Sequence, residues 1–125
     1  LGLRQQVIKG LKPNIDRARV IGRAKTLRLR ALRDGEDFRG IYHALDSYRS
    51  VVPGDIIVVE NEVPQYAYFG ELNANLSIRS GAVAAVIGGA TRDSADVVNL
   101  GLPVFATGYN CQDVRKRATL DSINR

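Results

Sequence analysis

Apolar and polar positions recur along this 125-residue chain with two different periods. Alternation with period two predicts half-buried strands, and spacings of three and four predict amphipathic helices. In the first half, residues 19–32 are strand-like, with a bulge or bend expected at Gly22. Residues 38–50 have helical spacing, and residues 1–12 suit the end of a short helix that stops near Pro13.

The second half alternates short apolar runs with helical patterns. The predicted strands are 56–59, 82–87 and 102–108, and the predicted helices run from Gly70 to Gly81 and from Asp93 or Ser94 to Gly101. The tail after residue 109 reads as a turn or short helix followed by a strand. Strands that alternate with helices indicate an α/β domain whose second half pairs in parallel.

Length and composition predict a single domain over residues 1–125. Hydrophobic residues make up 45% and charged residues 25%, and no run reaches the roughly 18 apolar residues of a membrane span. Cys111 is the only cysteine, which excludes an internal disulfide and favours a reducing, cytoplasmic location. The chain has no methionine and ends in the strand-like SINR, so we expect an excerpt of a longer protein.

The net charge of +5 comes largely from the basic run between Arg17 and Arg33. Within it, Leu27 to Arg30 alternates leucine with arginine, as in a strand with one solvated face. No aromatic residue interleaves with the run, whereas single-stranded nucleic-acid sites usually provide stacking platforms. We therefore interpret the arginines as a solvated face, and we do not expect a nucleic-acid partner.

Candidate chemistry gathers at two predicted strand-loop-helix junctions, at Gly70 and in the segment GGATRD, residues 88–93. Loops that follow parallel strands meet at one edge of a sheet, where the free N–H groups of helix N-termini bind anions. Arg92 suits two parallel hydrogen bonds to a carboxylate, and Asp93 offers the oxygen ligands that Mg²⁺ or Mn²⁺ prefers. These features predict a ligand site, provided that the two junctions lie together.

A simpler interpretation of these residues stays open. Glu71 and Asp93 would favour the helix dipoles without any ligand, and Arg92 would then only neutralise a neighbour. His43 has no nearby histidine or cysteine and is interpreted as a surface or packing residue, while Cys111 has no partner histidine to make it a nucleophile. Complete dinucleotide-binding and phosphate-loop motifs are both absent.

Four motifs together resemble a known family: PGDIIVV, the Gly-Glu-Leu helix start, the GGATRD loop and the strand PVFATG. The chain is similar to the family that unites the regulator of ribonuclease E activity A with the 4-hydroxy-4-methyl-2-oxoglutarate aldolases. In the aldolase branch an acidic residue is followed, after twenty residues, by Arg-Asp. Here twenty residues separate Glu71 from Arg92, and Asp93 follows. Gly88 stands where many members carry aspartate.

The resemblance implies a layered β/β/α swivelling domain similar to the phosphohistidine domain, with part of the C-terminal sheet missing from this sequence. It also implies a class II, divalent-metal lyase that acts on pyruvate-derived oxo acids and decarboxylates oxaloacetate. Asp93 would ligate Mg²⁺ or Mn²⁺, and Arg92 would stabilise enolate charge. Glu71 would orient a water, while the Gly70 corner, with the N–H groups of Leu72 and Asn73, would hold the pyruvyl carboxylate.

Family members assemble as trimers or hexamers with active sites between subunits, and the resemblance implies the same assembly here. The regulator branch supplies the alternative function, in which the protein inhibits ribonuclease E by contact and needs no catalysis. That branch tends to lose the aspartate after the arginine. Asp93 therefore favours the lyase interpretation.

Overall fold

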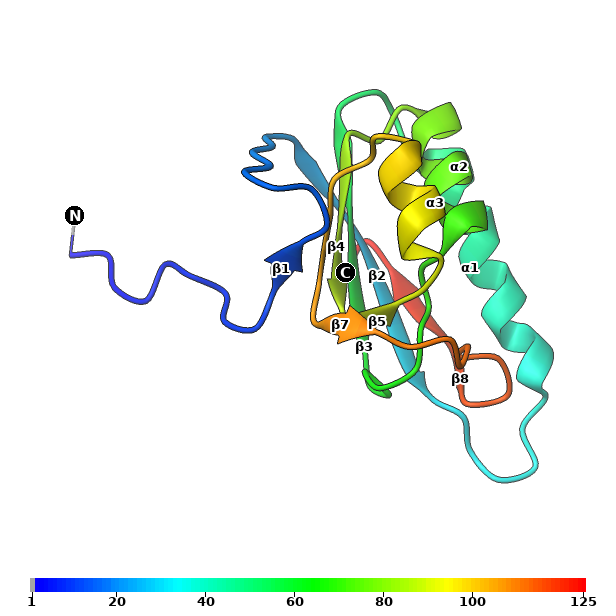
Figure 1. The fold of residues 1–125 in the computed structure, drawn as a ribbon. Helices are drawn as coiled ribbons and strands as arrows, with labels where there is room; N and C mark the ends of the chain where they lie inside the picture. Colours follow the sequence, from blue (N-terminus) through cyan, green and yellow to red (C-terminus); the bar gives the residue numbers. More distant parts are fainter. Residues whose placement is uncertain (1) are drawn as a thin grey trace.

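The structure, a computed structural model, describes residues 2–125 (Figure 1). A six-stranded sheet has the order β1-β6-β4-β3-β2-β8, and its helices lie together on one face. Strands β5 and β7 form a separate two-stranded sheet. The predicted mixed α/β fold is confirmed.

The elements have the following bounds in chain order. The strands of the large sheet are β1 (Lys12–Pro13), β2 (Arg23–Ala31), β3 (Asp55–Asn61), β4 (Ala84–Gly88), β6 (Val104–Ala106) and β8 (Ala118–Ile123), and those of the small sheet are β5 (Ala90–Thr91) and β7 (Gly108–Tyr109). The helical segments are η1 (Phe38–Tyr42), α1 (His43–Asp46), η2 (Ser47–Ser50), α2 (Glu71–Ser80) and α3 (Ser94–Asn99), where η denotes a 3₁₀ helix.

Four central strands of the large sheet run parallel. β2 pairs with β3, β3 with β4, and β4 with β6, while β1 and β8 add antiparallel edges. The carboxyl ends of the parallel strands therefore meet at one edge of the sheet. The small β5–β7 sheet and the loops that carry the candidate residues follow directly after those ends.

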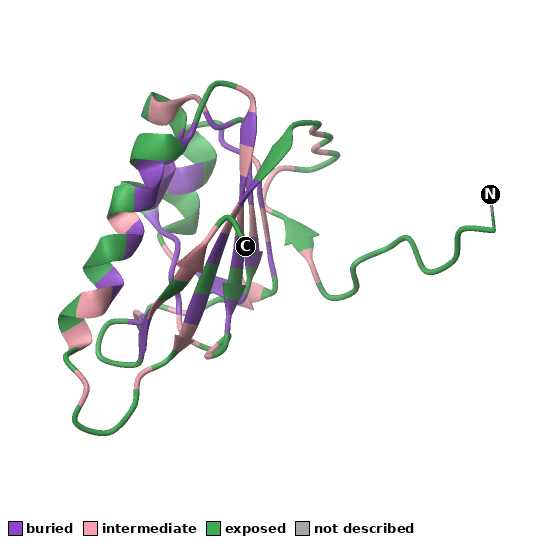
Figure 2. Cartoon of the chain, turned by 180° about the vertical axis from the view of Figure 1, so that it is seen from behind, coloured by how far each residue is buried: buried purple, intermediate pink, exposed green. Residues whose placement is uncertain are grey.

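The hydrophobic core lies between the sheet and the helices, as the buried colouring in Figure 2 shows. Leu27 and Leu29 of β2 are buried toward this core, and Arg28 between them is exposed. Alternate side chains of a strand point to opposite faces, so the period-two pattern predicted which residues the helices would cover. Val59 and Ile87 continue the same layer on β3 and β4.

Most predicted elements form near their predicted positions. Residues 38–50 are helical, as the continuous series η1, α1 and η2. Gly81 ends α2 with a φ of 97°, the left-handed conformation that glycine adopts without strain. The tail forms no helix and enters β8, antiparallel to β2. None of the helices in residues 2–125 is long and apolar enough to cross a membrane.

Two local predictions were wrong. Residue 1 of the expected N-terminal helix lies outside the described residues. Residues 2–10 form no helix and extend away from the domain as an exposed segment, because nothing packs against their apolar side chains (Figure 1). Gly22 causes no bulge, since the irregularity of β2 lies between Arg28 and Leu29. Gly22 precedes the strand and lies against the carbonyl of Gly54, where a side chain would not fit.

Candidate active site at two helix entrances

The two predicted junctions lie against each other in the fold. The backbone N–H of Arg92 donates to the carbonyl of Phe69 at 2.9 Å, and Phe69 also forms a parallel bridge with Thr91. A Cβ atom at Gly70 would lie 2.5 Å from Asp93 Oδ2 and 3.0 Å from Arg92 Cγ. The predicted proximity of the Gly70 corner to Arg92 and Asp93 is therefore confirmed, and glycine is what permits it.

Asp93 connects the entrances of two helices. It occupies the N-cap position of α3, but its side chain makes no capping bond there. Its backbone is left-handed, at φ 55° and ψ 39°, and its Oδ2 accepts the N–H of Glu71 at 3.0 Å. Of the two residues expected at the start of this helix, Asp93 or Ser94, Asp93 takes the N-cap position, but its carboxylate caps the first turn of α2 instead.

Two of the other first-turn amides of α2 have no acceptor in the described part of the chain. The N–H of Ala74 donates to Gly70 at 2.9 Å, while those of Leu72 and Asn73 have no backbone acceptor within residues 2–125. The Asn73 side chain is held in place, since it accepts from Tyr48 Oη at 3.0 Å and donates to the Tyr68 carbonyl at 2.9 Å. Glu71 is exposed beside these amides.

A cavity of about 330 Å³ opens in front of this corner. Arg92 lines it between two carboxylates, with its Nη2 3.4 Å from Asp113 and its Nε 3.8 Å from Asp93. The Nε atom is buried without a hydrogen-bond partner among the described residues, while the Arg92 side chain as a whole is 41% exposed. The other residues that line the cavity are Ile41, Tyr42, Leu45, Tyr68, Gly70, Leu72, Asn73, Val114 and Arg115.

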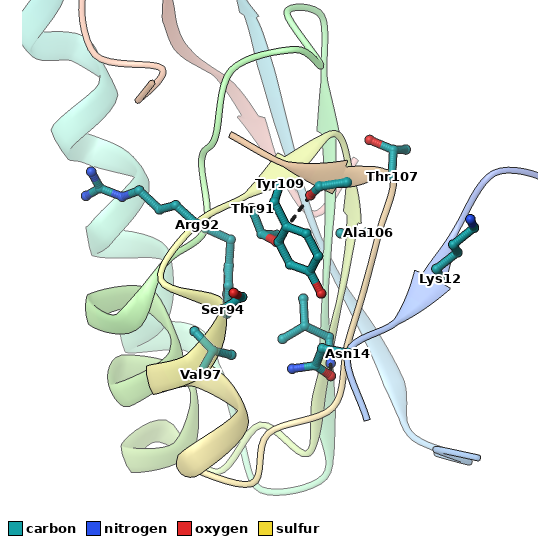
Figure 3. A pocket seen from close by; sticks show the side chains of 12 residues that line it. Lys12, Asn14, Thr91, Arg92, Ser94, Val97, Ala106, Thr107 and Tyr109 are labelled. Atoms are coloured by element: carbon teal, nitrogen blue, oxygen red, sulfur yellow. Dashed lines mark hydrogen bonds between the residues drawn. The ribbon is translucent and has the colours of Figure 1, made fainter. Parts of the chain in front are cut away.

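A smaller cavity of about 70 Å³ lies on the other side of the Arg92 loop (Figure 3). Figure 3 shows the Arg92 side chain extending away from Tyr109 and Asn14, which line this second space. The Asn14 amide is already satisfied, because it donates to the carbonyl of Leu102 and accepts from the N–H of Val104. The Arg92 guanidinium therefore points toward the larger cavity.

A family model described as RraA-like, Aldolase/RraA, matches residues 1–125. The chain belongs to the RraA-like family. The family predicted from the four motifs is thus confirmed. It contains aldolases and ribonuclease E inhibitors alike, so membership leaves the specific activity to be proposed.

Solved structures agree with the RraA-like fold. An uncharacterized protein of Pseudomonas syringae is 21% identical with a TM-score of 0.80, and the match covers 94% of this chain and 51% of that one. The ribonuclease ES inhibitor homologue RraAS2 of Streptomyces coelicolor is 23% identical with a TM-score of 0.72, with coverage of 84% and 51%. This chain spans about half the length of both proteins. No curated protein matches.

A third structure, the RNA-processing inhibitor RraA of Thermus thermophilis, is 19% identical with a TM-score of 0.70. The match covers 93% of this chain and 68% of that one. At these identities the likenesses show the fold and do not transfer an activity.

Few carboxylates near the Gly70 corner could hold a metal ion. Residues 2–125 contain no group of three or more histidine, cysteine, aspartate or glutamate side chains placed to hold a metal. Asp93 has one oxygen occupied by the Glu71 N–H, and its Oδ1 accepts no hydrogen bond in the described chain. Mg²⁺ usually keeps several waters and takes one or two carboxylates plus substrate oxygens. Asp93 fits such a site and does not form a closed protein cage.

Three residues of this site were missed by sequence reasoning. Tyr68, Asp113 and Arg115 line the cavity, although no motif marks them. Asp113 reaches it through a bridge to Ala67 and accepts the N–H of Arg115 at 2.7 Å. The only sequence signal was this Asx-type turn in the tail, and a turn of this kind does not reveal what it faces.

The remaining candidate residues behave as interpreted from the sequence. Arg28 lies within 4 Å of Glu60, Glu62 and Asp121, at 3.5, 3.3 and 3.8 Å, so the basic strand face carries ion pairs in solvent. His43 is exposed, with its Nδ1 3.5 Å from Asp46, and Cys111 is an exposed free thiol.

Proposed function

We propose that this RraA-like chain carries a divalent-metal-dependent lyase site for pyruvate-derived oxo acids. The substrates would include 4-hydroxy-4-methyl-2-oxoglutarate, with oxaloacetate decarboxylation as a second reaction through the same pyruvate enolate. The observation that carries the proposal is that Arg92, Gly70 and the first turn of α2 line one cavity. The Asp93 carboxylate lies against Gly70, the Glu71 N–H and Arg92 next to it.

The first turn of α2 would orient the substrate. The N–H groups of Leu72 and Asn73 would bind the pyruvyl carboxylate, since free amides at a helix N-terminus favour an anion. Arg92 would donate to the keto oxygen or to the adjoining carboxylate oxygen. Its charge would then stabilise the negative charge that develops on that oxygen when the carbon–carbon bond breaks.

Asp93 would hold Mg²⁺ or Mn²⁺, which supplies Lewis-acid polarisation of the keto group when bound. Glu71 would orient a water for proton transfer, a role that suits an exposed carboxylate beside the cavity. Arg115 adds a second guanidinium to the lining, stacked over the rings of Phe38 and Tyr42 at 5.4 and 6.0 Å. A second positive charge favours an oxo acid that carries a second carboxylate.

The decisive experiment is a magnesium-dependent pyruvate-release assay on the full-length protein with both substrates. Arg92→Ala should lower kcat by at least about 100-fold, because it removes the donor to the developing oxyanion. The melting temperature should stay close to that of the wild type. Arg28→Ala, a matched change on the solvated strand face, should leave the rate unchanged. An Arg92→Ala enzyme as active as wild type would refute the role of this residue.

The alternative function is a non-catalytic regulator that binds ribonuclease E. It is favoured by the structural likeness to the inhibitor homologue RraAS2, and it is opposed by the aspartate that follows Arg92. A pull-down with purified ribonuclease E discriminates between the two. Binding together with no lyase activity on either substrate would make the regulator the better assignment. A homotrimer or hexamer, with sites between subunits, is part of both proposals.

A further inference from the structure

The carboxylate of Asp113, in the segment that precedes β8, contacts both arginines that line the 330 Å³ cavity. Its Oδ2 lies 3.4 Å from Nη2 of Arg92, and its Oδ1 accepts the backbone N–H of Arg115 at 2.7 Å. Asp113 also belongs to the lining of the cavity itself. The proposed function gives this residue no role, so its two contacts remain to be explained.

The backbone of Asp113 is fixed to the segment that leads into α2. The N–H of Ala67 donates to the carbonyl of Gln112 at 2.8 Å, and the N–H of Val114 donates to the carbonyl of Ala67 at 3.0 Å. These two hydrogen bonds flank Asp113 in its bridge to Ala67, which is fully buried. A short side chain on a backbone held from both sides has a well-defined position, as a residue that orients a functional group requires.

Arg92 has more freedom than Asp113, because its side chain is long and 41% exposed. Its Nε lies 3.8 Å from Oδ2 of Asp93, the proposed metal ligand. With that carboxylate as its only anion, the guanidinium would be drawn toward Asp93 by the attraction of opposite charges. Asp113 provides a second anion at a different nitrogen, Nη2. Attraction at two nitrogens of a planar group restricts its orientation as well as its position.

The ion pair of Arg92 with Asp113 contributes little to the stability of the fold. The two side chains are 41% and 35% exposed, and exposed ion pairs often have no measurable effect on stability. Their effect on a reaction can be much larger, because a misplacement of about 1 Å in a functional group can cost on the order of 100-fold in rate. The contact should therefore be detected in turnover and ligand affinity, and hardly in the melting temperature.

We infer that Asp113 is a positioning residue, which orients the Arg92 guanidinium toward the substrate oxygen and fixes the segment that carries Arg115. This inference rests on the proposed function, since it concerns the arginine that is proposed to stabilise the enolate. Asp113 acts on the substrate only through the two arginines.

The first test is Asp113→Asn in the full-length, magnesium-loaded protein. Asparagine keeps a carbonyl oxygen for the Arg115 N–H and removes the charge next to Arg92. We expect kcat for pyruvate release to fall about tenfold, part of the loss expected for a 1 Å misplacement. KM should change by less than about threefold, because the amides of α2 still bind the carboxylate. Oxalate, a planar dianion shaped like the pyruvate enolate, should bind about tenfold more weakly in calorimetry.

The second variant, Asp113→Ala, removes both contacts. Its kcat should fall as far as that of Asp113→Asn. Its KM for 4-hydroxy-4-methyl-2-oxoglutarate, which carries a second carboxylate, should also rise, because the segment that places Arg115 loses its acceptor. An equal KM for the two variants would overturn the part of the inference that concerns Arg115.

A double-mutant cycle separates positioning of Arg92 from a general structural role. In an Arg92→Ala background, Asp113→Asn should leave kcat and oxalate affinity unchanged, because its effect passes through the missing guanidinium. The same tenfold loss in both backgrounds would overturn the inference. Tighter oxalate binding by Asp113→Asn alone would also overturn it, since Asp113 would then only compete with the ligand for Arg92.

Asp121→Asn is the matched control. Asp121 is 37% exposed, and its Oδ2 lies 3.8 Å from Nε of Arg28 on the solvated strand face, outside the cavity. This variant should retain the turnover and oxalate affinity of the wild type. If the wild type releases pyruvate and binds oxalate, and Asp113→Asn does both equally well, only the inference fails. If the wild type does neither, the proposed function and the inference both fail.

Discussion

At Gly70, the missing side chain leaves room for the two residues proposed to bind the substrate and the metal. The glycine backbone is extended, at φ −143° and ψ −158°, a conformation open to any residue. Glycine is therefore required for lack of space and not for its backbone conformation, because Asp93 Oδ2 and Arg92 occupy the volume that a methyl group would take.

Gly70→Ala should fold and lose function. The added methyl group would displace Asp93 from the Glu71 N–H and shift Arg92, and a misplacement of about 1 Å can cost on the order of 100-fold in rate. Pyruvate release and oxalate affinity should both fall at least tenfold, with far-ultraviolet circular dichroism unchanged. Gly108→Ala, where a new Cβ meets no atom within 4 Å, is the control. Wild-type turnover by Gly70→Ala would contradict this account.

At the scale of elements, the site depends on how α2 and α3 begin. Asp93 belongs to the first residues of the α3 unit, but its carboxylate accepts an N–H from α2. One side chain thus ties two helix entrances together, and the same carboxylate is the proposed metal ligand. Its structural and chemical roles can be separated by substitution.

Asp93→Asn keeps a carbonyl oxygen for the Glu71 N–H, whereas Asp93→Ala loses the acceptor. We expect the alanine variant to be destabilised by about 0.5–2 kcal/mol, the usual cost of removing a helix cap, and the asparagine variant by much less. Both should lose Mg²⁺ affinity in calorimetry, because a neutral amide is a weaker ligand than a carboxylate. If the Asp93→Asn variant bound Mg²⁺ as tightly as the wild type, Asp93 would be excluded as the metal ligand.

At the scale of the whole molecule, a buried carboxylate paired with an exposed arginine lies where β2 and β3 begin, at the end of the sheet opposite the site. Asp55 is 2% exposed and stands opposite Arg23 in the pairing of β2 with β3. The Asp55 Oδ1 atom forms an ion pair with Arg23 Nη2 at 2.7 Å. Its other oxygen accepts the N–H of Val52 at 2.9 Å. The Val52 N–H above all, and Arg23 in addition, lower the pKa of Asp55.

The lowered pKa of Asp55 predicts how stability depends on pH. A carboxyl group whose pKa falls on folding stabilises the folded state above its unfolded pKa of about 3.9, and that contribution is lost as pH falls through the folded value. Asp55→Asn should therefore melt below the wild type at pH 7, and the gap in melting temperature should narrow progressively as the pH falls below the unfolded pKa. A gap in melting temperature that stays constant from pH 7 to pH 2 would contradict the prediction.

Sequence alone was sufficient for features with a local cause. The alternation of leucine and arginine in β2 follows from one strand facing a core and solvent at once, and Gly81 ends α2 because its φ is left-handed. Four motifs were enough to identify the RraA-like family. The expected helix at the N-terminus failed because a helical pattern without a surface to pack on has little stability by itself.

Tertiary structure alone decided which side chains face one another across the site. Tyr68 lines the cavity, Asp113 flanks Arg92 from the far tail, and the Asp93 carboxylate caps α2 in place of α3. Residues 68 and 113 are brought together by the pairing of distant segments, which leaves no period or spacing in the sequence. Periodicity reports the direction in which a side chain points, and only packing determines what it meets.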